Sequence, residues 1–352
     1  MRHGSMVDPP NRFEKVHRQL QLDQVEWDLE YLQQLDHRKI EYFDDDSKSI
    51  VSENDSPDIP FRYSLNPYRG CVHGCAYCYA RPTHEYLGLN AGLDFETKVL
   101  VKERAPQLFR DWLARDSWKP QLIVMSGVTD CYQPAERQLK LTRGCLEVAL
   151  EARQPISIVT KNTLVTRDID VLKEMTRFKI VNVALSVTTL DYDLAQVMEP
   201  RTSTPCARLR AIRELNDSGI PTHVMVSPII PGLNDSEIPG ILNAAKEAGA
   251  WSASYILLRL PLSVREVFLE WLERAQPQAK DRVMSRIRST REGELSSSRF
   301  GDRMKGSGEL ADQIAQTMRV FSKKYGLDRT PDPLETSHFR PPKQSSGQLH
   351  LF

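Results

Sequence analysis

The stretch ISIVTKNTLVTRDIDVLKEMTRFKIVNVALSV (residues 156–187) contains two apolar runs separated by a segment of helical period. The runs ISIVT (156–160) and VNVALSV (181–187) are mostly apolar and rich in β-branched residues, which is typical of strands buried on both faces. Between them, DIDVLKEMTRF (168–178) carries apolar residues three or four positions apart, the spacing of an amphipathic helix. The stretch therefore predicts a strand–helix–strand unit whose two strands lie parallel in one sheet.

The same alternation extends in both directions along the chain. Segments of helical period also occupy 141–153, 207–219 and 237–249, and the last two end in Gly219 and Gly249, which suit helix C-caps. The predicted strands are FRYSL (61–65), QLIVMSG (121–127), ISIVTKN (156–162), VNVALSV (181–187), THVMVSPII (222–230) and SASYILLRL (252–260). Six strands alternating with helices predict an α/β fold, a partial (β/α)6 barrel of the TIM type.

Composition divides the chain into four parts. Residues 1–55 are polar and charged, with one amphipathic stretch at 24–35, and are predicted to form an N-terminal extension. The barrel is predicted over 56–265, followed by a helical and partly basic region over 266–330. A flexible tail rich in Pro and Ser is predicted over 331–352.

The charges of the chain balance, with 47 Lys and Arg against 47 Asp and Glu in 352 residues. No overall field therefore directs it toward nucleic acid or an anionic membrane. The N-terminus, MRHGSMVDPPNRFEKV, lacks the apolar core of a signal peptide, and no stretch approaches the ~18 apolar residues of a membrane span. We expect a cytoplasmic protein without a membrane partner, in which thiols stay reduced.

Three cysteines stand together in NPYRGCVHGCAYCYARPTHEYLG (66–88): Cys71, Cys75 and Cys78, with the spacing C-x3-C-x2-C. Reduced thiolates in such a cluster favour zinc, copper or an iron–sulfur cluster over a disulfide. Zinc sites pair C-x2-C units with two further ligands, a pattern that the nearby histidines do not complete. A [4Fe–4S] cluster held by three thiolates leaves one iron open to a small molecule, and the spacing favours this interpretation.

The motif C-x3-C-x-aromatic-C, with Tyr77 before Cys78, resembles that of the radical S-adenosylmethionine (SAM) superfamily. Other segments, over residues 11 to about 340, are similar to its spore photoproduct lyase-like branch, often labelled DNA repair photolyase-like: NRFE (11–14), SPDIPF (56–61), GLDFETK (92–98), TDCYQPAE (129–136), EPR (199–201), IIPGLND (229–235) and LRLP (258–261). The resemblance implies that Cys71, Cys75 and Cys78 hold a [4Fe–4S] cluster. It also implies that SAM binds the open iron and is cleaved reductively to a 5'-deoxyadenosyl radical. This cleavage requires an electron donor as a partner.

The resemblance further implies which residues contact SAM. Gly127, Thr129 and Asp130 close the second predicted strand and match the segment that binds its amino group. Lys161, after the third strand, is similar to the lysine that meets its carboxylate. Ser186, after the fourth strand, is similar to the ribose contact. These residues fall at the carboxyl ends of the strands, where barrel enzymes gather their active sites.

Four residues lie near the cofactors, and three of them have competing explanations. Tyr77 is expected to pack beside the adenine. Asp130 is equally explained as a helix N-cap or loop acceptor. The alternative for Lys161 is an ordinary exposed lysine, but its place directly after an apolar run at the barrel mouth favours the functional role. Cys131 lies near the position from which a cysteine of spore photoproduct lyase returns a hydrogen atom to its substrate, which makes it a candidate donor. Gly127 matches that position better, however, and the alternative for Cys131 is a packed thiol.

Three charged residues follow the later strands. Glu199 and Arg201 either close over the site or pair with each other on the surface, and surface pairing is the expectation. Arg259 ends the sixth predicted strand within an apolar run. A buried arginine needs an anionic partner, which is either an internal carboxylate or a substrate phosphate.

Two segments point to partners. The C-terminal GQLHLF is similar to the Q-L-x-L-F motif by which bacterial DNA-repair proteins and polymerases bind the replication sliding clamp, with Gln348, Leu349, Leu351 and Phe352 as the matching residues. The alternative is that these apolar residues dock onto the protein's own surface. Residues 274–305 carry nine Lys or Arg against four Asp or Glu. That excess suits contacts with a nucleic-acid backbone, and a solvated helix face explains it equally well.

The predicted function is that of a radical SAM enzyme acting on a nucleic-acid lesion or modified base. Two other functions stay open at this point. One is radical chemistry on a peptide or small metabolite, which the neutral net charge favours. The other is a non-catalytic iron–sulfur protein, whose cluster would not respond to added SAM.

Overall fold

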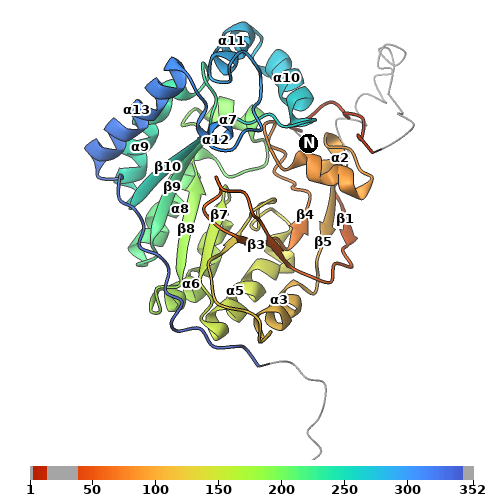
Figure 1. Cartoon of the computed structure of the whole chain (residues 1–352), viewed down its shortest axis with the longest axis vertical. Coiled ribbons are helices and arrows are strands. Elements are labelled where there is room, and N and C mark those ends of the chain that lie inside the picture. The colour runs from red at the N-terminus through yellow and green to blue at the C-terminus, as the bar shows by residue number, and fades with distance from the viewer. Residues whose placement is uncertain (1–2, 14–38, 344–352) are drawn as a thin grey trace, which may run out of the picture.

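The main sheet of the molecule forms an open barrel (Figure 1). The computed structural model describes residues 3–13 and 39–343. Within them, the strands of this sheet are, in spatial order, β10 (Ser252–Leu257), β9 (Thr222–Ile229), β8 (Val181–Ser186), β7 (Ile156–Thr160), β6 (Ile123–Met125), β3 (Tyr63–Leu65) and β2 (Val51–Glu53). The strands from β10 to β3 are parallel, and β2 runs antiparallel to β3. All six predicted strands are present, each inside its predicted range, and the partial barrel is confirmed.

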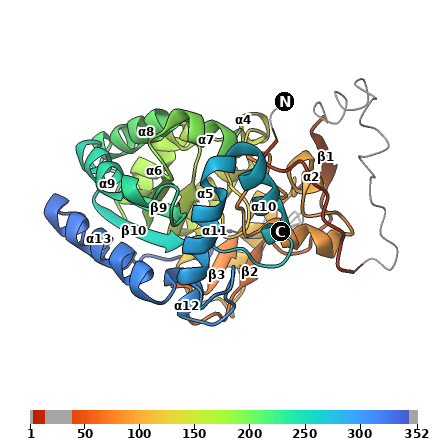
Figure 2. The same ribbon diagram turned by 90° about the horizontal axis from the view of Figure 1, so that it is seen from above.

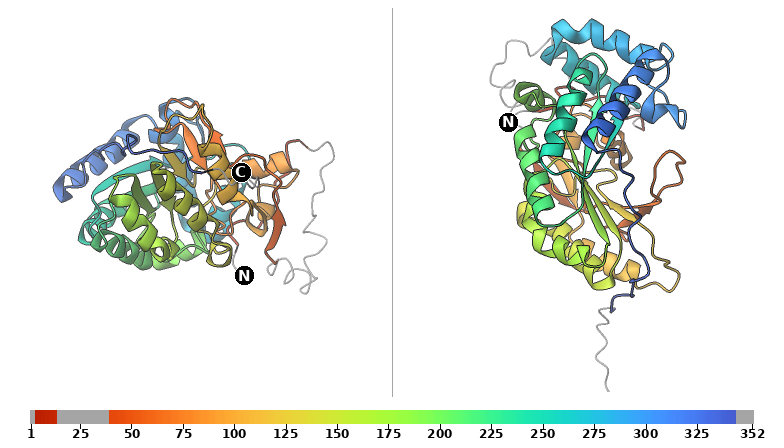
Figure 3. Two further views of the ribbon diagram at one scale, coloured as in Figure 1. Left: turned by 90° about the horizontal axis from the view of Figure 1, so that it is seen from below. Right: turned by 90° about the vertical axis from the view of Figure 1, so that its left-hand side faces the viewer.

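Helices cover the outer face of the sheet, as the strand–helix alternation predicted (Figures 1 and 3). Local sequence explains where several of them start and stop. Thr204 accepts a hydrogen bond from the amide of Ala207 and precedes a proline, which starts the next helix. Gly219 and Gly249 adopt φ values of +80° and +91° directly after two helices, as predicted. The outer helices are α3 (Ala105–Leu113), α5 (Leu141–Ala152), α6 (Ile169–Thr176), α8 (Pro205–Asp217), α9 (Ile238–Glu247) and α13 (Glu309–Tyr325).

The largest hydrophobic core lies between the strands and these helices. Ile158 and Val183 of the sheet are fully buried, as are Leu146, Ile212 and Ile241 of the helices. Burying a side chain of this size contributes roughly 1.5–3 kcal/mol relative to leaving it in water. Packing between the strands and the outer helices thus stabilises the barrel, so the loops at the carboxyl ends of the strands can carry polar side chains.

Further helices gather at one end of the barrel (Figures 1 and 2). α10 (Val264–Ala275) and α11 (Lys280–Ser289) pack there around a second core that includes Trp271, whose indole N–H donates to the carbonyl of Val197 at 2.9 Å. The shorter elements are η2 (Arg81–Leu87), α2 (Leu93–Thr97), α4 (Glu136–Leu139), η3 (Thr163–Asp168), α7 (Tyr192–Met198), η4 (Asp235–Glu237), η5 (Pro277–Ala279) and α12 (Asp302–Lys305). Among the described residues, no helix is long and apolar enough to traverse a bilayer.

The N-terminal segment is more closely integrated than predicted. A small sheet pairs β1 (Glu41–Asp44) with β5 (Lys98–Val101), which in turn pairs with β4 (Tyr68–Arg69). Because β1 and β2 both belong to the predicted extension 1–55, a boundary at residue 56 cuts through both sheets. Short polar strands such as β1 and β2 are hard to predict from the sequence, because they are stabilised by pairing with the barrel and have no apolar pattern of their own.

The segment after α13 is also more ordered than predicted. It runs down the side of the barrel (Figure 3), where the amide of Glu335 donates to Lys179 and that of Arg340 donates to Ala152. Phe339 packs against the main core. The prediction of a flexible tail is therefore wrong over 331–343. The sliding-clamp motif, Gln348, Leu349, Leu351 and Phe352, lies outside the described residues.

Candidate active site

The three clustered cysteines lie on the loop that joins β4 to η2. Cys71 and Cys75 are buried and Cys78 is partly exposed. Gly74 turns the loop between them with a φ of +64°, and a Cβ at this position would lie 2.4 Å from Oε2 of Glu96. Only glycine fits both the conformation and the space, so the residue between the first two cysteines is constrained by the fold beneath them.

Two arginines and one carboxylate hold the backbone of this loop. Arg81 donates two hydrogen bonds, of 3.1 and 3.0 Å, to the carbonyl of Cys75 and a third, of 2.9 Å, to Glu96. Arg201 donates to the carbonyl of Val72 and to Glu96. Burial raises the pKa of Glu96, but the charges of Arg81 and Arg201 and a hydrogen bond with His3 outweigh this and lower the pKa to about 2. Glu96 is thus an anion that orients both guanidinium groups.

The surroundings of the thiols are mainly apolar, and the cations of Lys161 and Arg81 lie nearby. Cys75 and Cys78 pack against the second core beside Leu258 and Leu260. Burial raises the pKa of Cys75 well above its usual value, and the carboxyl group of Glu199 and the neighbouring thiols add to this, while the Lys161 ammonium lowers it. A negative charge on these sulfurs therefore requires a bound cationic centre.

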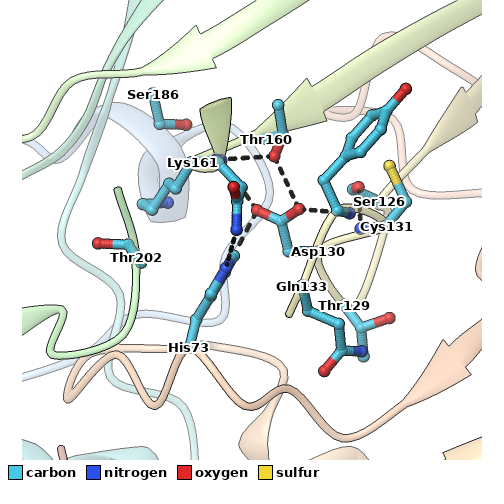
Figure 4. A network of polar contacts seen from close by, with 12 residues as sticks. His73, Ser126, Thr129, Asp130, Cys131, Gln133, Thr160, Lys161, Ser186 and Thr202 are labelled. Atoms are coloured by element: carbon cyan, nitrogen blue, oxygen red, sulfur yellow. Dashed lines mark hydrogen bonds and ion pairs between the residues drawn. The ribbon is translucent and has the colours of Figure 1, made fainter. Parts of the chain in front are cut away.

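Asp130 lies at the centre of a polar network at the carboxyl ends of β6 and β7 (Figure 4). Its carboxylate accepts from the hydroxyl of Thr160 at 2.7 Å, from the amide of Lys161 at 2.8 Å and from the amide of Tyr132 at 2.9 Å. It also pairs with His73 at 3.4 Å. Burial raises the pKa of Asp130, but His73 and these hydrogen bonds outweigh it and lower the pKa to about 2. Its contacts are those of a loop acceptor, and SAM binding stays a prediction.

Lys161 projects toward the cysteine loop from the end of β7. Its ammonium lies 5.7 Å from the ring centroid of Tyr77, and no carboxylate pairs with it among the described residues. Ser186 ends β8 and is buried, and its carbonyl accepts from Arg208. The fold therefore brings the cation, the Ser186 hydroxyl and the cysteine loop to the same end of the barrel (Figure 4).

Tyr77 is connected to a buried ion pair. Its hydroxyl donates to Glu199, which also accepts from Thr188 at 2.7 Å and pairs with Arg208. Burial raises the pKa of Glu199, against the opposing charge of Arg208. The expected surface pair between Glu199 and Arg201 is wrong, because both side chains have other partners inside the molecule.

The remaining predicted residues have structural contacts. Thr129 is buried and donates to the carbonyl of Tyr68 at 3.0 Å. A Cβ at Gly127 would lie 2.7 Å from that of Ser64, so glycine permits the close approach of β6 to β3. Cys131 is fully buried in the main core, and burial raises its pKa well above the usual value. This placement favours the packed thiol over a hydrogen donor.

Comparison with known proteins gives the family. The model of the radical SAM superfamily matches residues 65–245. This chain belongs to the radical SAM superfamily. Enzymes of this superfamily use a [4Fe–4S] cluster and SAM, and they need an electron donor. The cofactors of this chain are therefore a [4Fe–4S] cluster and SAM.

Proteins of similar sequence are uncharacterized. A protein of Mycobacterium tuberculosis is 40% identical over 226 residues, which cover 64% of this chain and 66% of its own length. The alignment thus spans just under two thirds of that relative. A protein of Methanocaldococcus jannaschii is 30% identical over 248 residues, which cover 70% of this chain and 88% of its own.

Solved structures of spore photoproduct lyase share the fold. One, complexed with dinucleoside spore photoproduct, has a TM-score of 0.57 at 16% identity and covers 81% of this chain and 79% of its own. A mutant of that lyase with bound AdoMet and the same photoproduct has a TM-score of 0.57 at 17% identity, covering 81% and 78%. At such identities the likeness shows a common radical SAM fold.

The cysteine loop fits the cluster of this superfamily. Thiolates are the ligands that iron–sulfur clusters select, and here three come from one buried loop beside the Lys161 ammonium. In the described residues, no three His, Cys, Asp or Glu side chains are grouped to hold a single metal ion. Thiolates of a [4Fe–4S] cluster bind three separate irons, so they are spaced more widely.

Several residues of the site were missed by analysis of the sequence. Arg81 and Glu96 support the cysteine loop, and Arg208 supports Tyr77 through its pair with Glu199. Arg81 and Glu96 lie in ARPTHEYLG and GLDFETK, two segments that carry the family resemblance. A signal was therefore present, but the pairing of their charges is visible only in three dimensions.

Proposed function

We propose that this chain is a radical SAM enzyme whose cluster is held by Cys71, Cys75 and Cys78 and whose substrate is a nucleic-acid lesion or modified base. When bound, the reduced cluster and SAM supply a 5'-deoxyadenosyl radical that abstracts hydrogen from the substrate. The observation that carries the proposal is the convergence of three thiols, two buried and one partly exposed, and the Lys161 ammonium at the carboxyl end of a parallel barrel.

The side chains around the loop have separate tasks in this proposal. Lys161 binds the carboxylate of SAM, because it is a cation beside the thiols with no carboxylate partner among the described residues. Ser186 offers its hydroxyl to the ribose. Tyr77, fixed by Glu199, provides a ring against which the adenine stacks. Asp130 positions Lys161 by accepting from its backbone amide.

The nucleic-acid part of the proposal is supported by two observations. Spore photoproduct lyase, whose fold this chain shares, has been solved with dinucleoside spore photoproduct. The region 274–305 at the same end of the barrel has nine Lys or Arg against four Asp or Glu. A local cationic surface attracts a polyanion even when the net charge of the chain is zero.

Anaerobic reconstitution tests the proposal. The wild-type chain, loaded with iron and sulfide and reduced with dithionite, is expected to release 5'-deoxyadenosine from SAM. Replacing Cys71, Cys75 or Cys78 by Ala should abolish both the cluster absorbance and this release, because each loss leaves an iron without its ligand. The Cys206→Ala variant, which removes an exposed cysteine on α8, serves as the matched control and should behave as wild type.

The substrate class is tested in the same reaction. Oligonucleotides with and without ultraviolet lesions are added, and the yield of 5'-deoxyadenosine and the products are followed by mass spectrometry. Turnover of a damaged or modified strand supports the proposal. Unchanged release in the cysteine variants would refute the cluster assignment, and turnover of peptides alone would refute the substrate class.

A further inference from the structure

Three arginines gather where the barrel is open. The main sheet has β10 at one edge and β2 at the other, without a pairing between them in the described residues. Arg259 follows β10, Arg291 follows α11, and Arg303 lies on α12, which contacts β10. Arg303 pairs with Asp58, from the segment before β3, and so connects the two edges of the opening.

Two of these arginines have no carboxylate partner in the described part of the chain. Arg259 contacts only the sulfur of Met304, at 3.6 Å, and the ring of Tyr79, whose centroid lies 5.6 Å from its guanidinium carbon. Arg291 donates to the backbone carbonyls of Leu258 and Asp302. The nearby carboxylates are already engaged.

The carboxylates of this region belong to other arginines. Asp58 accepts from Arg303 at 2.6 Å, and Asp302 pairs with Arg299 at 3.2 Å. Burial and the charge of Arg303 lower the pKa of Arg259. Burial and the charge of Arg259 lower the pKa of Arg291 to about 10. Arg259 is half-buried and Arg291 is buried. Guanidinium groups that repel one another in such an environment are stabilised by an added anion.

The position of these arginines connects them to the cysteine loop. Tyr79, on whose ring Arg259 lies, directly follows Cys78 in the chain. Its hydroxyl donates to the carbonyl of Gly127 at 2.7 Å, so the ring is fixed at the end of β6. An anion that meets Arg259 is therefore held next to the residues that we propose bind the cluster.

Exposed rings beside the same arginines indicate what kind of anion fits. The side chain of Tyr79 is 48% exposed and that of Phe300 is 59% exposed. The guanidinium of Arg303 lies 4.7 Å from the ring centroid of Phe300. Cationic side chains alternating with accessible aromatic rings are what single-stranded nucleic acid requires, because phosphates meet the charges and bases stack on the rings.

We propose that Arg259 binds a backbone phosphate of the nucleic-acid substrate at the open edge of the barrel, with the charge of the buried Arg291 behind it, while Tyr79 and Phe300 offer ring faces to its bases. The inference rests on the proposed function, whose substrate class it makes specific. It assigns to Arg259 the anionic partner that an arginine in an apolar run requires.

Fluorescence anisotropy with a short labelled single-stranded oligodeoxynucleotide and the reconstituted holoenzyme tests the inference. Arg259→Gln should weaken binding about tenfold, the effect of losing one charge-assisted contact. It should also make the slope of log Kd against log salt shallower by about 0.7, since one phosphate contact on a single strand is lost. Arg259→Lys keeps the charge and should keep the salt slope.

Arg210→Gln is the matched control, because Arg210 is exposed on α8, outside the basic region 274–305. It should change the affinity by less than about twofold. Equal weakening by Arg259→Gln and Arg210→Gln, or an unchanged salt slope in Arg259→Gln, would overturn the inference. Displacement of the oligonucleotide by polyglutamate at matched charge would overturn it as well, in favour of an acidic peptide.

The two proposals fail in distinguishable ways. Binding that depends on Arg259 in a chain that holds no cluster or does not cleave SAM would refute the proposed function and retain a phosphate site. Cleavage of SAM without binding that depends on Arg259 would refute the phosphate site alone.

Discussion

Lys161 occupies an unusual position for a single residue. It follows the apolar strand β7, its backbone amide is held by Asp130, and its ammonium lies beside Tyr77 and the cysteine loop. Ammonium groups in such places are normally paired with a carboxylate, and within the described residues this one is not. The carboxylate of SAM would complete the pair.

Replacing Lys161 by Met should raise the apparent KM for SAM by about tenfold or more, because a hydrogen bond to a charged group contributes roughly 1.5–3 kcal/mol. The measurement is initial release of 5'-deoxyadenosine against SAM concentration in the reconstituted enzyme. Lys173→Met, an exposed position on α6, is the control and should leave the KM unchanged. A KM within twofold of wild type in Lys161→Met would contradict the assignment.

Glu96 is a second residue with a specific task, since it is fully buried and pairs with Arg81 and Arg201. The Glu96→Gln variant should lower the free energy of unfolding by roughly 3 kcal/mol, because two buried guanidinium groups lose their anion. Urea unfolding followed by circular dichroism at pH 7 measures the change. Glu174→Gln, which removes an exposed pair with Arg177, should cost less than about 1 kcal/mol. Equal effects of the two substitutions would show that Glu96 does not hold the loop.

At the scale of elements, the pairing of β9 with β10 contains a titratable group. His223 of β9 lies opposite Ser252 of β10, and its ring nitrogens contact the hydroxyls of Ser252 at 2.8 Å and Ser254 at 2.6 Å. Burial lowers the pKa of His223 to about 4. The strand pair therefore favours the neutral imidazole.

This environment predicts a pH dependence of stability. A histidine whose pKa is lowered in the folded state binds its proton more tightly when unfolded, so its stabilisation is present above pH 6.5 and is lost as the pH falls through 4. We expect the urea midpoint to decline over this range, with a contribution from His223 of roughly 3 kcal/mol. His223→Gln should show a shallower decline. Parallel pH profiles for the wild type and His223→Gln would contradict this role of His223.

At the scale of the whole molecule, the C-terminal segment docks onto two neighbouring helices, α5 and α6, that are far from it in the sequence. Residues 335–340 bond to the backbone after α6 and at the end of α5, and Phe339 reaches the main core. Removing 331–352 should lower the thermal midpoint by several degrees, because these contacts each contribute on the order of 1 kcal/mol.

A shorter deletion isolates that effect. The chain without 344–352 keeps every described contact of the segment and should melt like the full chain when both are followed by circular dichroism. If the two truncations lowered the midpoint equally, the docked segment would not be the stabilising part.

Periodicity and local spacing in the sequence were enough to predict the strands of the barrel and the position of the cluster motif. Apolar runs separated by helical segments predicted all six parallel strands, since burial on both faces of a sheet demands such runs. The C-x3-C-x2-C spacing places three thiols on one short loop, so the cluster motif is contained in eight adjacent residues. Neither inference needs contacts between distant parts of the chain.

Only the tertiary structure revealed which charges meet. Glu199 and Arg201 stand two positions apart but pair with Arg208 and Glu96 respectively, while Arg259 meets no carboxylate in the described residues. An ion pair depends on where distant segments are brought together, and every acidic residue is a chemically equivalent partner until folding selects one. The edge strands β1 and β2 and the docked segment 331–343 depend on the same kind of long-range contact, which no local pattern encodes.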